Sequence, residues 1–298
     1  MRAAPVEHRL ALPQGDLCWF EWGVPSARPS LLLLHATGFH ARVWDATIAA
    51  LPEDLHIVAP DLRGHGRSYN PDSIVDWGAT ADDLPGLVEV AFPGLVVGVG
   101  HSMGGYCLAH LAAAMPGRFE RLLLVDAVVL PPDTYEPDAA VPDASEHPVS
   151  RRRNVWESPE AMIASFAPRV PYVSWLPQVL DDYCRYGLVL DVDGGGYVLG
   201  CPPRIEASAY LGSLHNDAAP IIAGVDCPVT VLRARTGERT GSMDFSISPT
   251  WPRLAGAFRD GRDMQWPDVS HFIPMEVPER LAALILSEVE AAEAVERD

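Results

Sequence analysis

The chain has 298 residues, of which 48% are hydrophobic, and its 22 basic residues are outnumbered by 40 acidic residues, giving a net charge of −18. This length suits one large hydrophobic core with an insertion, because single cores stop growing near about 250–300 residues. The negative charge argues against nucleic acid and anionic membrane surfaces as partners, since both attract clustered positive charge.

All of the basic residues are arginine, because the sequence contains no lysine. This excludes a lysine Schiff base, a Ser–Lys pair and a phosphate-binding loop of the Walker type. The five cysteines show no CxxC or Cys/His spacing, so we expect reduced thiols and no metal site. The chain lacks a signal-peptide-like apolar start and any apolar run long enough to cross a bilayer, which predicts a cytoplasmic protein.

In chain order, the sequence predicts a hairpin followed by alternating strands and helices. The hairpin pairs Val6–Leu12 with Leu17–Trp22 around a turn at Gly15. Short apolar runs, typical of strands buried on both faces of a parallel sheet, follow at Leu31–Leu34, Ile57–Ala59, Leu95–Val99, Leu122–Val125 and Val229–Leu232. Helical patterns are present at Val43–Leu51, Thr80–Phe92, Met103–Met115 and Pro278–Val289. This alternation predicts an α/β fold, with a mostly parallel central sheet flanked by helices.

The alternation is interrupted within residues 131–225, which we interpret as a separate unit inserted into a core formed by residues 1–130 and 226–298. The insertion has its own element signals, which predict helices from Pro159, over Pro177–Tyr186 and over Pro203–Leu214, and a hairpin of Leu188–Val192 with Tyr197–Leu199. Its aromatic residues either line a substrate pocket or form a small core. Its arginine run, residues 151–153, either meets an anionic substrate group or, as we expect, forms a solvated basic face.

The segment Val97–Gly105 ends a predicted strand and enters a helix rich in small residues. Within it, Gly100-x-Ser102-x-Gly104 is the nucleophile-elbow pattern, in the strand–turn–helix context that this pattern requires. The glycines are expected there because the turn is strained and the strand and helix approach closely. The pattern predicts that Ser102 is a catalytic nucleophile, against the alternative of an incidental serine in a glycine-rich turn.

The elbow and three further motifs resemble those of the α/β-hydrolase superfamily, in the same order along the chain. Leu31–Phe39 resembles its oxyanion loop, with Ala36 in place of the usual glycine, and Asp61–Ser68 matches its DxRGHGxS turn. His271, followed by Glu276-x-Pro278-Glu279, matches the end of its catalytic-histidine loop. The resemblance implies an α/β-hydrolase fold with a helical cap inserted after strand 6, and it implies no cofactor.

By the same resemblance, His271 is the general base and a carboxylate completes a catalytic triad. The family usually places this acid in the loop after strand 7, which makes Asp244 the first choice, with Asp126 at the end of strand 6 as the alternative and Glu238 a third candidate. The oxyanion hole is expected to use the backbone N–H groups of Met103 and Thr37, with Gly38 as a substitute for Thr37. His35 and His65 are expected to make structural hydrogen bonds.

Together these features predict a serine hydrolase that cleaves an ester, thioester or lactone of a small, largely apolar substrate through an acyl-enzyme on Ser102. Alternatives are C–C bond hydrolysis, perhydrolysis or a biosynthetic cyclase or lyase step, and, from another class, a non-catalytic small-molecule receptor. Haloalkane dehalogenase and epoxide hydrolase chemistry is disfavoured, because those relatives have aspartate at the elbow. The expected partner is a small-molecule substrate, and a homodimer is an open alternative to a monomer.

Overall fold

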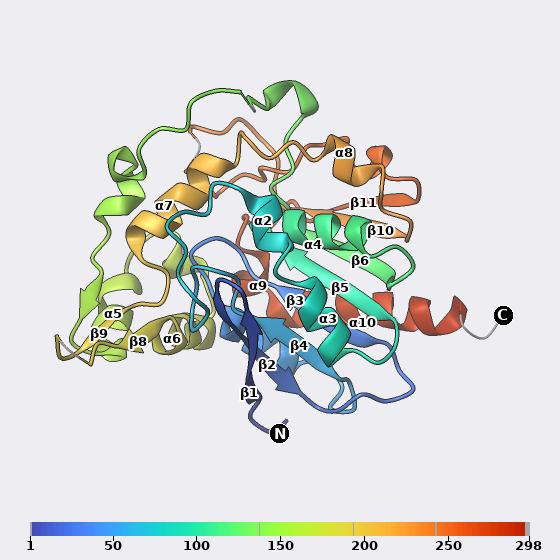
Figure 1. Cartoon of the computed structure of the whole chain (residues 1–298), viewed down its shortest axis with the longest axis horizontal. Helices are drawn as coiled ribbons and strands as arrows, with labels where there is room; N and C mark the ends of the chain where they lie inside the picture. Colours follow the sequence, from blue (N-terminus) through green and yellow to red (C-terminus); the bar gives the residue numbers. More distant parts are fainter. Residues whose placement is uncertain (1, 137, 193, 242, 296–298) are drawn as a thin grey trace.

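The computed structural model describes residues 2–136, 138–192, 194–241 and 243–295. Its centre is an eight-stranded sheet with the strand order β1-β2-β4-β3-β5-β6-β10-β11 (Figure 1). All neighbours from β4 to β11 pair in parallel, whereas β2 pairs antiparallel with β1 and with β4. The bounds are β1 Val6–Leu12, β2 Gly15–Trp22, β3 Ser30–Leu34, β4 Ile57–Pro60, β5 Val96–His101, β6 Phe119–Val125, β10 Val229–Arg233 and β11 Gly261–Gln265. The predicted α/β-hydrolase architecture, with a mostly parallel central sheet, is confirmed.

The central strands are apolar without alternation because both faces of the sheet are covered. Leu31 and Leu33 of β3 belong to one buried cluster, whereas Leu32 and Leu34 belong to a second cluster on the opposite face. Since neighbouring side chains of a strand point to opposite faces, a strand inside such a sheet must be apolar at every position. All four leucines are fully buried.

Helices from the whole chain cover the two faces of the sheet (Figure 1). Residues of α1 and α10 contribute to the first cluster, and residues of α2, α3 and α4 contribute to the second. The bounds are η1 Ala41–Trp44, α1 Asp45–Ala49, α2 Trp77–Ala81, α3 Pro85–Ala91, α4 Met103–Ala114, η6 Leu254–Ala257, α9 Ile273–Glu276 and α10 Pro278–Val295. None of the helices in the described residues is long and apolar enough to cross a membrane.

Most of the chain between β6 and β10 forms a layer beside the sheet, on the left in Figure 1, whereas its last helix, α8, lies near α4. It contains helices α5, α6 and α7 and a small antiparallel sheet of order β7-β9-β8. The bounds are η2 Pro132–Thr134, η3 Ala144–Glu146, η4 Pro148–Arg151, β7 Val155–Trp156, α5 Pro159–Phe166, η5 Tyr172–Ser174, α6 Pro177–Tyr186, β8 Leu188–Leu190, β9 Tyr197–Leu199, α7 Pro203–Gly212 and α8 Ala219–Ile222. Helix α5 begins at Pro159 as its sequence predicts, and the Ser158 side chain caps it by accepting a hydrogen bond from the Ala161 N–H. The division of the chain into 1–130 with 226–298 and 131–225 stays a prediction.

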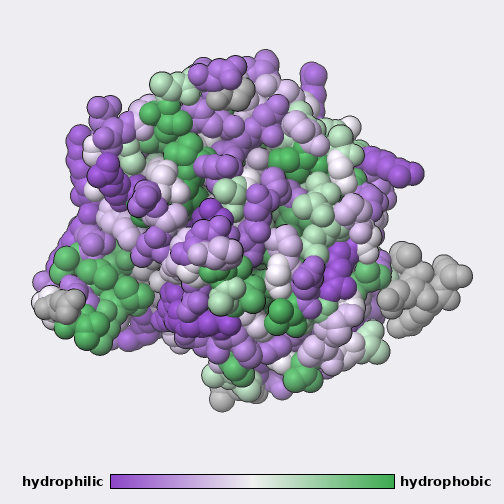
Figure 2. Space-filling view, viewed as in Figure 1, coloured by the Kyte–Doolittle hydropathy of each residue, from purple (hydrophilic) through white to green (hydrophobic). Residues whose placement is uncertain are grey.

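The insertion has an apolar outer end and an inner side that packs on the main sheet. Val155 and Leu190 of the three-stranded sheet are 55% and 63% exposed, and Figure 2 shows hydrophobic surface at this end of the molecule. On the inner side, Trp175 and Tyr183 belong to the same buried cluster as β3. The insertion and the main sheet therefore share a hydrophobic core.

Two elements differ from the sequence prediction. Thr80–Phe92 was expected as one helix, but the structure has α2 and α3, with Asp76 capping the first and Pro85 beginning the second. Proline is favoured at the first helical position, so a helix starts where continuity was predicted. The last helix was predicted to end at Val289, yet α10 continues to Val295, and Glu288 is buried in hydrogen bonds with Arg121 and Thr230. Residues 296–298 lie outside the described residues.

Candidate active site

Ser102 lies at the sharp turn between the end of β5 and the start of α4. Its backbone has φ 57° and ψ −121°, a conformation that L-residues rarely adopt and that typically costs about 1–3 kcal/mol. The turn requires glycine on both sides, because a Cβ on Gly100 would lie 2.4 Å from the Gly104 carbonyl oxygen. A Cβ on Gly104 would lie 2.5 Å from the carbonyl oxygens of Leu34 and His35. The glycines of the motif therefore permit the tight strand–helix packing that places Ser102 above the sheet.

His271 links Ser102 to a buried carboxylate. Its Nε2 lies 3.0 Å from Ser102 Oγ, and its Nδ1 lies 2.7 Å from Oδ2 of Asp126. A neutral imidazole with its proton on Nδ1 donates to the carboxylate and accepts the serine proton at Nε2. The histidine, serine and aspartate side chains therefore form one hydrogen-bonded line, with His271 only 2% and Asp126 0% exposed.

Two hydrogen bonds to the backbone of His271 fix its loop, which lies between β11 and α9. The His271 N–H donates to the Phe245 carbonyl (3.0 Å), and the Phe245 ring stacks on the imidazole with ring centres 5.7 Å apart. Nε2 of His101 donates to the His271 carbonyl (2.9 Å). Burial holds the pKa of His101 well below its usual range, so this neighbour of Ser102 is a neutral donor. His101 therefore connects the nucleophile strand to the histidine loop.

The carboxylate beside His271 is Asp126, and the contact expected of Asp244 is not formed. Asp126 follows β6 directly, with φ 45°, a left-handed conformation that aspartate tolerates better than most residues. Its Oδ1 accepts the Ala234 N–H (2.9 Å) and the hydroxyls of Ser248 and Thr250. The carboxylate is thus held by four donors from three separate segments when the His271 Nδ1–H is included.

Asp244 instead stabilises its own loop at the surface. Its oxygens accept hydrogen bonds from the backbone and side chains of Thr240 and Ser246, and these bonds, that of the Ser246 hydroxyl foremost, hold its pKa well below the usual range. Glu238 is exposed on the same loop. The loop after β10 therefore reaches the site through Ser248 and Thr250, which support Asp126. The number of residues between Asp244 and His271 does not reveal this arrangement; the available signal is the composition of the loop, because Thr240 and Ser246 favour self-contained turns.

The predicted oxyanion residues lie where the β3 loop meets the start of α4. The Thr37 hydroxyl donates to the Met103 sulfur (3.3 Å), so the two residues are in contact. Among the described residues, the N–H groups of Thr37 and Met103 have no hydrogen-bond acceptor, whereas the Gly38 N–H donates to Nε2 of His65 (2.9 Å). Gly38 is therefore engaged elsewhere, which leaves Thr37 and Met103 as the pair with available donors.

The histidines of the two remaining motifs make the structural hydrogen bonds expected of them. Nδ1 of His65 donates to the Arg63 carbonyl, and burial lowers the pKa of His65 to about 4, so its Nε2 is free to accept from Gly38. Nε2 of His35 accepts the Leu62 N–H, and its Nδ1 donates to the Ala36 carbonyl. These neutral rings shape the loop that carries Thr37.

A cavity of about 440 Å³ opens beside Ser102. This volume lies within the range of about 300–1,000 Å³ that is common for small-molecule sites. Its apolar lining includes Trp77, Leu130, Leu211 and Phe245. In the described part of the chain, no three His, Cys, Asp or Glu side chains are grouped so that they could hold a metal ion. All five cysteines are buried and unpaired.

Comparison with known proteins shows that the sequence of this chain is similar to those of enzymes. A family model described as "Alpha/beta hydrolase family" matches residues 31–284. "Lipase LipV" of Mycobacterium tuberculosis is 28% identical over 280 residues, which are 88% of this chain and 94% of the relative. The 2-(acetamidomethylene)succinate hydrolase of Mesorhizobium japonicum is 27% identical over 210 residues, covering 70% of this chain and 72% of the relative.

Solved structures share the fold over nearly the whole chain. A thermophilic esterase from Thermogutta terrifontis, solved with malate bound, has a TM-score of 0.65 and 26% identity, and the match covers 97% of this chain and 99% of the esterase. A thioesterase domain from the curacin biosynthetic pathway has a TM-score of 0.75 at 18% identity, covering 95% of this chain and all of that domain.

Proposed function

The chain belongs to the alpha/beta hydrolase family and is a hydrolase, and we propose that it cleaves an ester, thioester or lactone of a small, largely apolar substrate through an acyl-enzyme on Ser102. The hydrogen-bonded line from Asp126 through His271 to Ser102 carries the proposal. Ser30, His56 and Glu21 form a second serine–imidazole–carboxylate line, but its carboxylate is only partly buried and Ser30 does not line the cavity beside Ser102.

In the proposed reaction, Ser102 Oγ attacks the substrate carbonyl while Nε2 of His271 takes the serine proton. Asp126 keeps the other imidazole proton on Nδ1 and stabilises the imidazolium that forms. The backbone N–H groups of Thr37 and Met103 donate to the oxyanion, and the N-terminus of α4 adds a favourable field. His271 returns its proton to the leaving group, and a water molecule activated by His271 then releases the acyl group. The steps use only side chains, backbone donors and water.

The cavity beside Ser102 is suited to an apolar acyl or alcohol group of the substrate. Its walls are mainly hydrocarbon and aromatic, so binding removes apolar substrate surface from water. At about 440 Å³ it is large enough for a medium-length acyl chain or an aromatic ring. The lipase and esterase names of relatives agree with ester cleavage as the reaction class.

The test combines active-site labelling with ester hydrolysis. We expect a fluorophosphonate probe to label the wild-type protein and p-nitrophenyl esters of increasing chain length to be hydrolysed. Ser102→Ala should abolish labelling and lower kcat by several orders of magnitude, without a large change in melting temperature. The matched control is Ser213→Ala, because Ser213 lines the same cavity while its hydroxyl donates to the Tyr210 carbonyl. Full labelling of Ser102→Ala, or equal loss in Ser213→Ala, would contradict the proposal.

A further inference from the structure

A second, larger cavity lies between the insertion and the active site. Its volume is about 670 Å³, and it shares the side chains of Tyr210, Met243 and Phe245 with the cavity beside Ser102. The two cavities are therefore neighbours, so a substrate that reacts at Ser102 and passes these three side chains reaches the second cavity. Phe39 and Phe272 line its inner side, toward the oxyanion loop and the histidine loop.

The charged lining of this second cavity is opposite in sign to the whole chain. The lining contains four arginines but only one acidic residue, Glu206, although acidic residues outnumber basic ones by 18 in the whole chain. The arginines are Arg151, Arg152, Arg153 and Arg169. A concave site with fixed charges of one sign concentrates ligands of the opposite sign. Attraction of an anion is therefore a local property of this cavity and is not shared by the surface as a whole.

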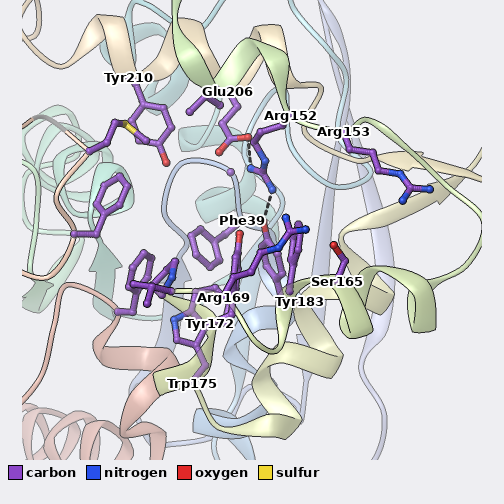
Figure 3. Close-up of a pocket in the computed structure, with 18 of the residues that line it drawn as sticks. Phe39, Arg152, Arg153, Ser165, Arg169, Tyr172, Trp175, Tyr183, Glu206 and Tyr210 are labelled. Atoms are coloured by element: carbon purple, nitrogen blue, oxygen red, sulfur yellow. Dashed lines mark hydrogen bonds and ion pairs between the residues drawn. The ribbon is translucent and has the colours of Figure 1, made fainter.

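Arg152 is fixed within the cavity, which corrects the expectation that the arginine run forms only a solvated face. It is partly buried, donates from Nη1 to Glu206, and donates from Nη2 to the hydroxyl of Tyr183 (3.1 Å). Figure 3 shows both contacts as dashed lines at the centre of the cavity. A guanidinium has five N–H donors, and these two contacts leave donors for a ligand. Glu206 therefore positions Arg152 without using all of its hydrogen-bonding capacity.

Arg169 supplies a second positive charge from a different segment. It lies in the exposed connection between α5 and η5, and within the described residues its guanidinium forms no ion pair or hydrogen bond. In Figure 3 the side chains of Arg152 and Arg169 extend toward the same space, above the rings of Tyr172 and Tyr183. Arg153, in contrast, is paired with Glu157 and lies to one side.

We propose that this second cavity binds an oxyanion at one end of the substrate, a carboxylate or phosphate, through Arg152 and Arg169. The inference deepens the proposed function and rests on it: the scissile ester lies at Ser102 and an apolar segment passes Tyr210 and Phe245. The substrate class is then an amphipathic ester with a terminal anion, because two arginines with aromatic walls match a planar anionic group on an apolar stem.

The first experiment compares two esters that differ in one charge, p-nitrophenyl hydrogen suberate and p-nitrophenyl methyl suberate. We expect the wild type to favour the anionic ester in kcat/KM, mainly through a lower KM, and the preference to fall with added salt. Arg169→Gln should reduce the preference by about tenfold, as expected for loss of a charge-assisted contact, and leave the neutral ester unchanged. Arg204→Gln is the matched control, because it removes an equal charge from the exposed side of α7.

A second variant separates anion binding from structural damage. Arg152→Gln alone leaves Glu206 buried without its partner, so Arg152→Gln is combined with Glu206→Gln to remove both charges together. The double variant should lose the preference for the anionic ester and still hydrolyse the neutral one. An unchanged preference in both Arg169→Gln and the double variant would overturn the inference, while turnover of the neutral ester would leave the proposed function intact.

A binding measurement tests the cavity even if no ester is turned over. Suberate should raise the melting temperature of Ser102→Ala, because a ligand bound only to the folded state stabilises it, and dimethyl suberate should not. The stabilisation should disappear in Ser102→Ala combined with Arg169→Gln. Octyl phosphate in place of suberate distinguishes a phosphate from a carboxylate site. Absence of stabilisation by either anion, or equal stabilisation after Arg169→Gln, would show that the cavity does not recognise anions.

Discussion

Replacing Asp126 by asparagine tests which proton His271 carries. Oδ1 of Asp126 accepts the Ala234 N–H, which can only donate, together with the Ser248 hydroxyl. In Asp126→Asn we expect the amide oxygen to occupy the position of Oδ1, where it can still accept the Ala234 N–H. The reverse orientation would point the amide NH₂ at the Ala234 N–H and lose a buried hydrogen bond, at a cost of about 1–3 kcal/mol. The amide NH₂ therefore faces Nδ1 of His271.

This orientation imposes the wrong tautomer on the imidazole. A donor facing Nδ1 makes that nitrogen an acceptor, so the single proton of neutral His271 moves to Nε2, which faces Ser102 at 3.0 Å. His271 can then no longer accept the serine proton. A triad with its acid converted to the amide loses about 10⁴-fold in kcat, and since each tenfold corresponds to about 1.4 kcal/mol, the barrier should rise by about 5–6 kcal/mol.

The assay is hydrolysis of a p-nitrophenyl ester by variants whose folding is verified by circular dichroism at the assay temperature. Asparagine tolerates the positive φ at this position, so Asp126→Asn should fold. Asp244→Asn is the control: the partly exposed Asp244 side chain bonds only to its own loop among the described residues, so kcat should change by about twofold or less. A folded Asp126→Asn with near-normal kcat, beside a crippled Asp244→Asn, would refute the reasoning.

Three further predictions concern stability, each checked by chemical denaturation. Gly104→Ala should destabilise the protein by about 3 kcal/mol or more, because its methyl group meets backbone oxygens that cannot move independently of the sheet. Glu288→Ala should lose about 3 kcal/mol, because Arg121 is left unpaired, whereas exposed Glu290→Ala should change little; equal effects would contradict the packing of α10. Burial, with a nearby aspartate, raises the pKa of Asp182 to about 7, so the folded protein holds a proton that the unfolded chain releases near pH 4. Stability from this group should fall between about pH 4 and pH 7, and Asp182→Asn should raise stability above pH 7 by roughly 1 kcal/mol after solvent screening and flatten that slope.

The sequence was informative wherever one segment determines its own geometry. The elbow around Ser102, the strand runs and the Ser158 cap are local patterns, and the structure has the corresponding elements in place. The choice between Asp126 and Asp244 was different, because it depends on how a long loop folds against two strand ends. A local signal did exist: Asp244 stands among Thr240 and Ser246, residues that favour self-contained turns, whereas Asp126 directly follows a buried strand.

The inserted segment shows a second limit of sequence reasoning. Arg151–Arg153 are adjacent in sequence, yet Arg152 alone is held by Glu206, while Arg153 pairs with Glu157 at the surface. In a segment without regular secondary structure, contacts with residues distant in the sequence decide which side chains are buried and which are exposed. A run of like charges therefore predicts a basic surface on average and gives no indication of which member turns inward.

The described residues other than glycine with left-handed φ are Ser102 and Asp126, and both belong to the hydrogen-bonded line. Glycine would adopt either conformation with less strain. At Asp126 the carboxylate accepts four hydrogen bonds, so glycine there would leave buried donors unpaired, whereas the Ser102 hydroxyl is hydrogen-bonded only to His271 among the described residues. Variants selected only for resistance to heat should therefore drift toward glycine at Ser102 and become inactive as they become more stable, so directed evolution for thermostability has to retain an activity screen.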